Sequence, residues 1–251
     1  MPTMNKSRTL TVIAYAPALA KHDDRALAIV HGMEQSLPGL RLQWKLAGGG
    51  RPIALPDRDA WLMEHTLDGA FPLLCNGDES HPITVSGRDR SGLFCPGGQD
   101  QLEVHARLPL DDRGIAAASA LLDGMAEGAR AFWGHASPES YGSEVARQFR
   151  RSPQAPERSP RGLPMLDLPE KLSAPETPCF LGWLNHWSSA AAKVIGFPAH
   201  DAGLLSRARR TASGGWIVQL TDAPLDYDNP VHLDALQQTY QHFPALGRRA
   251  A

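Results

Sequence analysis

The stretch Leu10–Ala20, LTVIAYAPALA, has two interpretations, and the start of the fold depends on which of them holds. As a strand, it places Leu10, Val12 and Ala14 on one side and Thr11, Ile13 and Tyr15 on the other. Because both sides are largely apolar, the strand would be mostly buried within a sheet. This interpretation makes residues 10–20 the first strand of the domain.

The same stretch also resembles a secretory signal peptide. Lys6 and Arg8 precede the apolar segment, which ends in Ala18-Leu19-Ala20, an A-x-A cleavage pattern. A periplasmic protein is the consequence if residues 1–20 act as a signal peptide. The strand interpretation instead leaves the cytoplasm as the expected compartment.

The composition restricts the classes of function. The 251 residues include 27 acidic and 25 basic side chains, a net charge of -2, which excludes binding of nucleic acid or membrane surfaces through bulk charge. No apolar run reaches the roughly 18 residues of a membrane-spanning helix. The three cysteines, at positions 75, 95 and 179, lack metal-ligand spacing, so we expect free buried thiols in a reducing compartment, with no metal.

Hydrophobic periodicity predicts one α+β domain over residues 1–251. We expect a mainly antiparallel sheet with helices packed chiefly on one face, an early pairing of the first strand with residues 40–46, and a central meander. An exposed loop rich in Pro and Arg is predicted at about 147–161. The other predicted strands are 73–75, 81–86, 101–106 and 216–220, and the predicted helices start near 23, 57, 113, 184, 202 and 229.

Sequence motifs for common chemistry are missing. Gly48-Gly49-Gly50 lacks the Lys that follows in a phosphate-binding loop, and the chain has no G-x-S-x-G or H-E-x-x-H motif. We therefore expect no cofactor and no catalytic residue. Trp183, His186 and Trp187 share one predicted helix, where they form either a core anchor or a stacked ligand site. Arg207, Arg209 and Arg210 are either solvated or able to hold a phosphate.

The stretch Leu220–Asp234 is acidic. It carries Asp222, Asp226, Asp228 and Asp234 and contains no Lys or Arg. Such an edge would attract a basic partner, for example the electropositive cleft of a nuclease. The alternative is structural, since Asp side chains also organise turns and favour the first turn of a helix.

Four motifs follow one another in the C-terminal third: Gly182-Trp183-Leu184, Gly214-Gly215-Trp216, the turn Asp222–Asp226 and the helix start Asn229-Pro230-Val231-His232. In this order they resemble the immunity protein 52 family of bacterial polymorphic-toxin systems, in an uncharacterised myxobacterial-type branch. Leu225 stands where the family commonly has an aromatic residue, and residues 150–161 look expanded. We expect structural roles for the motif residues Trp183, Trp216, Asn229, Pro230 and His232.

The resemblance implies a non-enzymatic immunity protein that binds one cognate toxin, delivered for example by type VI secretion. Toxins linked to this family are often restriction-endonuclease-like nucleases. Asp222, Asp226 and Asp228 are then the candidate toxin-binding residues, and no nucleic acid or membrane is expected as a direct partner. An alternative is a small hydrolase that uses His65, His81, His105 or His186; a third is a nucleic-acid-binding regulator that uses residues 147–161 and 207–210.

Overall fold

A ten-stranded sheet forms the centre of the structure, a computed structural model that describes residues 8–21, 23–66, 71–199 and 202–248. Neighbouring strands follow the order β3-β2-β4-β5-β6-β1-β7-β8-β10-β9, and each neighbouring pair is antiparallel. The bounds are β1 Thr9–Pro17, β2 Trp44–Leu46, β3 Pro52–Ala54, β4 Phe71–Cys75, β5 Thr84–Arg90, β6 Gln101–Pro109, β7 Trp133–Pro138, β8 Leu184–Trp187, β9 Ala208–Arg210 and β10 Trp216–Gln219.

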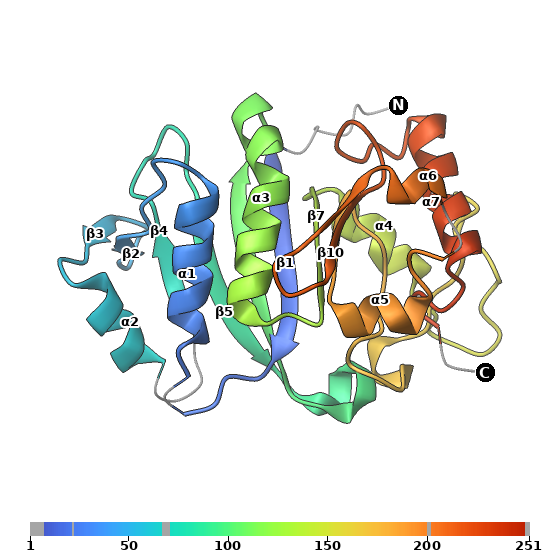
Figure 1. Cartoon of the computed structure of the whole chain (residues 1–251), viewed down its shortest axis with the longest axis horizontal. Helices are drawn as coiled ribbons and strands as arrows, with labels where there is room; N and C mark the ends of the chain where they lie inside the picture. The colour runs from blue at the N-terminus through green and yellow to red at the C-terminus, as the bar shows by residue number, and fades with distance from the viewer. Residues whose placement is uncertain (1–7, 22, 67–70, 200–201, 249–251) are drawn as a thin grey trace.

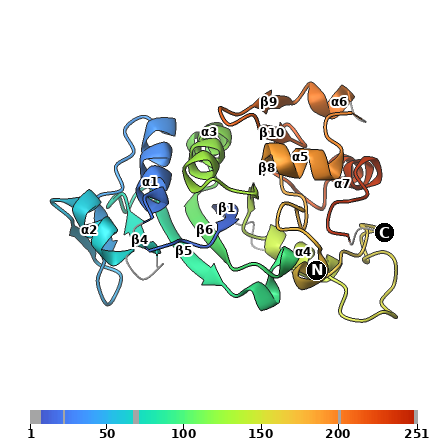
Figure 2. The same cartoon turned by 60° about the horizontal axis from the view of Figure 1, so that its bottom comes forward.

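Helices pack against both faces of this sheet. Figure 1 shows α1 and α3 side by side in front of the strands, whereas Figure 2 shows α4 on the opposite side. The bounds are α1 Arg25–Ser36, α2 Arg58–His65, α3 Asp112–Ala129, α4 Tyr141–Gln148, α5 Ser189–Ile195, α6 Ala202–Leu205 and α7 Pro230–His242. Buried apolar residues from Leu10 to Leu246 form one core. The predicted α+β fold in a single domain is confirmed.

Strand β1 occupies the middle of the sheet. It pairs with β6 along its whole length, from Thr9 opposite Pro109 to Pro17 opposite Gln101, and with β7 along its other edge. Leu10, Val12 and Ala14 are fully buried. In the folded chain, residues 10–17 of this stretch therefore belong to a buried strand, as the strand interpretation predicts.

Two expectations about the first half of the chain have different outcomes. The meander is confirmed, because β4, β5 and β6 are consecutive neighbours. The early pairing of β1 with residues 40–46 is wrong, since β4, β5 and β6 lie between β1 and β2. Only Trp44–Leu46 forms a strand there, and the backbone N–H of Leu42 donates to the Glu34 carboxylate (2.7 Å), not to a neighbouring strand.

The prediction of one helix near 184–195 is also wrong. Leu184–Trp187 forms strand β8, and all four of its side chains are buried. Helix α5 begins only after Ser188, whose hydroxyl accepts a hydrogen bond from the Ala191 N–H (3.1 Å). A fully buried strand has no polar face, so its pattern is indistinguishable from that of a buried helix.

Other differences arise where the sequence pattern is short or absent. The helix predicted from 202 to 210 ends at Leu205, and Ala208–Arg210 is edge strand β9. Strand β7, WGHASP, was not predicted, because all six of its residues are buried and none is β-branched. Residues 151–158 of the Pro/Arg-rich loop are exposed except for half-buried Ala155.

The three cysteines match their prediction, because Cys75, Cys95 and Cys179 are buried free thiols. No helix of the described residues is long and apolar enough to cross a bilayer.

Helices α1 and α3 approach each other through glycine. A Cβ built on Gly124 would lie 2.3 Å from the carbonyl oxygen of Gly32, and one built on Gly128 would lie 2.5 Å from the carbonyl carbon and oxygen of Ala28. These distances are shorter than any real Cβ contact, so a side chain here would push the helices apart. The close approach of the two helices therefore depends on these glycines.

We predict that Gly124→Ala lowers the free energy of unfolding by about 2 kcal/mol, because overpacking outweighs the better helix propensity of Ala. Gly142 is the matched control, since it is helical and nothing lies within 4 Å of its built Cβ. Gly142→Ala should leave stability unchanged or raise it by up to about 1 kcal/mol. Urea unfolding measures both variants, and wild-type stability of Gly124→Ala would contradict the close helix contact.

Candidate functional site

The acidic stretch between β10 and α7, residues 220–234, forms a corner of the molecule that we call the acidic corner. The side chains of Asp222 and Asp228 are 90% and 77% exposed. Each has an arginine partner outside the stretch: Arg207 lies 2.8 Å from Asp222, and Arg161 lies 3.1 Å from Asp228. The folded surface is therefore less negative than the sequence of residues 220–234 suggests, because arginines from outside the stretch lie beside it.

Asp226 stabilises the turn within this corner. Its carboxylate accepts a hydrogen bond from the Asp228 N–H (2.9 Å), and its own N–H donates to Nδ1 of His232 (3.1 Å). Asn229 caps α7 by accepting from the Val231 N–H (3.0 Å), and Pro230 occupies the first turn. Asp226, Asn229, Pro230 and His232 thus organise the turn and the start of α7.

The two motif tryptophans, Trp183 and Trp216, are both buried. Nε1 of Trp183 donates to the carbonyl of Thr221 (2.8 Å), so the start of the acidic corner is fixed to the core. The Trp216 ring packs edge-on against Phe197 at 5.1 Å between centroids, and the Arg210 guanidinium lies over it at 4.0 Å. Both tryptophans therefore contribute to packing.

The arginines near 207–210 are not an empty phosphate site. Arg209 and Arg210 belong to edge strand β9, and Arg207 lies between that strand and the end of the short helix α6. Arg207 pairs with Asp222, and Arg209 pairs with Asp123 of α3 (2.5 Å). Arg210 donates to the carbonyl of Gly214 (2.8 Å). Each guanidinium thus has a partner inside the chain.

A charged cluster that the sequence analysis missed lies on the face of the sheet away from α1 and α3. Buried Glu103 of β6 accepts hydrogen bonds from Arg88 (2.9 Å) and from Nε2 of His105 (2.9 Å), and Arg90 lies 3.4 Å away. Burial raises the pKa of Glu103, but the hydrogen bond and charge of His105 and the charge of Arg88 outweigh it and hold the pKa below its ordinary value. The β5–β6 register places Arg88 opposite Glu103, and this pairing is visible only in the folded sheet.

The histidines named for a hydrolase do not share one site. Nδ1 of His65 lies 2.8 Å from the Trp61 carbonyl oxygen, and His81 lies 3.3 Å from Asp111. His105 belongs to the Glu103 cluster. His186 is buried, and neither of its ring nitrogens has a hydrogen-bond partner among the described residues.

A further buried histidine, His135 of β7, was also missed. It lines a cavity of about 120 Å³ together with Ser137, Tyr141 and Phe180. Burial and then the charge of His105 lower the pKa of His135 to about 3. Ser137 Oγ lies 3.5 Å from Nδ1 of His135, but it donates to the Ala136 carbonyl (2.8 Å) and accepts from the Trp183 N–H (3.1 Å). The hydroxyl is therefore committed to the backbone and is not oriented for proton transfer to His135.

Within the described ranges, no three His, Cys, Asp or Glu side chains gather as metal ligands would.

The sequence and the fold are both similar to those of known proteins. The model of the DUF5953 family, a domain of unknown function, matches residues 21–251. The chain belongs to the DUF5953 family. No curated protein matches its sequence. Among solved structures, the Pseudomonas aeruginosa T6SS protein PA0821 is similar, with a TM-score of 0.55 and 15% identity, over 97% of this DUF5953 chain and 75% of that chain. At this identity the similarity shows a shared fold.

We predict that this DUF5953 protein loses stability as the pH falls from about 6.5 towards 4. Burial lowers the pKa of His186 to about 4, so between these pH values the unfolded chain binds a proton there and the folded chain does not. The loss attributable to His186 approaches about 3 kcal/mol at the acid end of this window. Urea unfolding between pH 4 and pH 7 measures it.

His186→Leu should remove about 3 kcal/mol of this pH dependence and leave the part that buried His135 contributes. His65→Leu is the control because His65 is exposed. A His186→Leu profile parallel to that of the wild type would show that His186 is not a buried neutral group.

Proposed function

We propose that this DUF5953 protein is an immunity protein, which binds a cognate secreted toxin in stoichiometric amounts and neutralises it without catalysis. The toxin class that best fits is a restriction-endonuclease-like nuclease. The resemblance of Gly214–His232 to the immunity protein 52 family supports this proposal. Its fold, shared with a T6SS protein, is consistent with a role in type VI secretion systems, which mediate competition between bacteria. The expected site of action is the cytoplasm, where such a toxin reaches nucleic acid.

The observation that carries the proposal is the exposure of the carboxylates at the acidic corner. Asp222 and Asp228 reach into solvent although each has an arginine partner. Exposed ion pairs contribute only about 0–1 kcal/mol each, so their carboxylates exchange partners at little cost. A cationic surface on another protein can therefore replace Arg207 and Arg161.

The backbone of the acidic corner is already ordered. Thr221 accepts from Trp183 through its carbonyl and donates from its hydroxyl to the Ala223 carbonyl (2.6 Å). At the other end, the His232 ring accepts from the Asp226 N–H. A surface held in this way loses little conformational entropy when a partner binds.

Charge complementarity then indicates the kind of partner. A nuclease must present cationic side chains to the phosphates of its substrate. The carboxylates of Asp222, Asp226 and Asp228 would compete for those side chains and would accelerate the encounter of the two proteins. Occupation of the nuclease cleft would then block access of nucleic acid without any chemical step.

A co-expression experiment tests the proposal. The chain is produced in a sensitive host together with the toxin-like protein encoded beside its own gene, and survival is scored before co-purification. We expect survival and a stable complex of the two proteins. Survival without a complex would favour an enzyme that reverses the damage, and death despite folded protein would contradict immunity.

We predict that replacing Asp222, Asp226 and Asp228 together by Asn slows association with the toxin by about tenfold at low salt and less at high salt. The matched control carries the same charge change at exposed Glu64, Glu79 and Glu170, each replaced by Gln. Stopped-flow mixing measures the association rate of both variants.

A second variant is needed because Asp226→Asn could also disturb the turn that Asp226 stabilises. Asp222→Asn with Asp234→Asn leaves Asp226 and its hydrogen bonds unchanged and should slow association in the same direction. Equal association rates for these variants and the control would exclude the acidic corner from the interface.

A further inference from the structure

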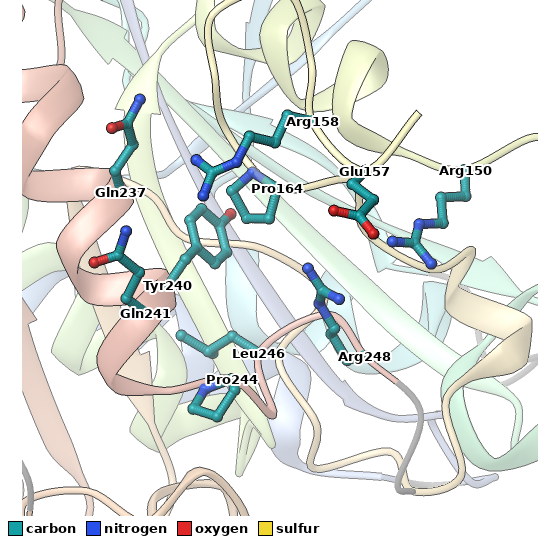
Figure 3. Close-up of a pocket in the computed structure, with 10 residues that line it drawn as sticks. All are labelled: Arg150, Glu157, Arg158, Pro164, Gln237, Tyr240, Gln241, Pro244, Leu246 and Arg248. Carbon is teal, nitrogen blue, oxygen red and sulfur yellow. The ribbon is translucent and has the colours of Figure 1, made fainter. Parts of the chain in front are cut away.

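A basic pocket lies at the opposite end of α7 from the acidic corner. It has a volume of about 380 Å³ and opens between the Pro/Arg-rich loop, the second half of α7 and the chain segment after it. Figure 3 shows side chains from these three segments pointing into one space. Its lining residues are Arg150, Glu157, Arg158, Pro164, Gln237, Tyr240, Gln241, Pro244, Leu246 and Arg248. We call this space the arginine pocket.

The charges of the pocket lining are not balanced. Arg150, Arg158 and Arg248 contribute three positive charges and Glu157 one negative charge, a net +2. In Figure 3 the Glu157 carboxylate lies between the guanidinium groups of Arg150 and Arg248. No ion pair within 4.0 Å joins these arginines to a carboxylate of the described residues, in contrast to Arg161, Arg207 and Arg209 elsewhere on the surface.

Hydrogen bonding in the pocket is also incomplete. Nε of Arg150 is buried and has no hydrogen-bond partner in the described part of the chain. Arg158 donates through one nitrogen to the carbonyl of Gly162 (2.8 Å). A guanidinium has five N–H donors, and a phosphate oxygen is the acceptor that matches its planar geometry. An anion in the pocket would reach the outer Nη donors of these guanidinium groups, whereas the Nε of Arg150 is buried beneath them.

The floor of the pocket keeps this positive charge over a wide pH range. Tyr240 is buried, and burial raises the pKa of its hydroxyl to about 12. The hydroxyl accepts a hydrogen bond from the Leu181 N–H (3.1 Å) and stays neutral at physiological pH. Pro164, Pro244 and Leu246 add apolar surface beside the arginines.

We propose that the arginine pocket binds a phosphate group carried by a small molecule of about mononucleotide size. The volume lies within the usual range of small-molecule sites, and the lining combines an apolar wall with convergent donors. Two or three guanidinium groups give the multiple charge-assisted hydrogen bonds that a phosphate dianion forms. This site is independent of the acidic corner and of the proposed toxin binding.

Isothermal titration of the full chain with inorganic phosphate and with AMP, at fixed ionic strength, tests this proposal. We expect both probes to bind, AMP more tightly because its nucleoside contacts the apolar wall. Arg150→Gln or Arg248→Gln should weaken binding by about tenfold or more, since each removes charged hydrogen bonds. Arg151→Gln is the matched control, because exposed Arg151 is the next residue in the same loop and does not line the pocket.

Glu157→Gln gives a result of opposite sign. It removes the one carboxylate of the lining, which repels phosphate at close range. Phosphate should therefore bind several-fold more tightly to this variant. This gain cannot arise from misfolding.

Three results would overturn the proposal. They are the absence of phosphate and AMP binding by folded protein, equal weakening by Arg151→Gln and Arg150→Gln, and tighter binding of citrate than of either phosphate probe. None of them bears on survival in the co-expression experiment, so the two proposals fail separately.

Discussion

The two-sided pairing of β1 is the constraint on which the rest of the structure depends. This strand joins the β6 side of the sheet to the β7 side, and the ladders on its two edges provide partners for its buried backbone N–H and C=O groups. A shift of one residue would move Leu10, Val12 and Ala14 from the α1 and α3 face to the other face. The stacking of Tyr15 on Trp133, with centroids 4.0 Å apart, adds side-chain contact to the β1–β7 pair. The register of this strand therefore sets which side chains meet on both faces.

Sequence periodicity predicted the elements that have one polar and one apolar side. In α3, the apolar stripe lies between charged positions, and in α7 the Asn229 cap and Pro230 mark the first turn. The same method failed for β7 and β8, since every side chain of these strands is buried and no alternation remains. A strand is buried on both faces because of the elements that pack against it in the folded protein, and its local sequence does not show which elements those are.

The sequence showed only part of each charged surface for a related reason. The composition of residues 220–234 located the acidic corner, but its partners Arg161 and Arg207 lie outside that stretch. Similarly, the arginine pocket draws on positions 150, 158 and 248, and only the position of α7 brings them together. The structural roles of Trp183 and His232 were predictable, because a buried indole N–H usually finds an acceptor and a His in the first turn of a helix can bond to the capping loop.

Helix α7 thus separates two surfaces of opposite charge. Its first turn supports the acidic corner, suited to a cationic protein, and its second half lines a pocket suited to a small anion. The most direct test of immunity is a titration of purified toxin activity with this protein. A stoichiometric inhibitor abolishes the activity linearly, with the end point at one equivalent or a small whole-number ratio. Complete loss of toxin activity at a small fraction of an equivalent would instead show catalytic turnover and contradict inhibition by binding.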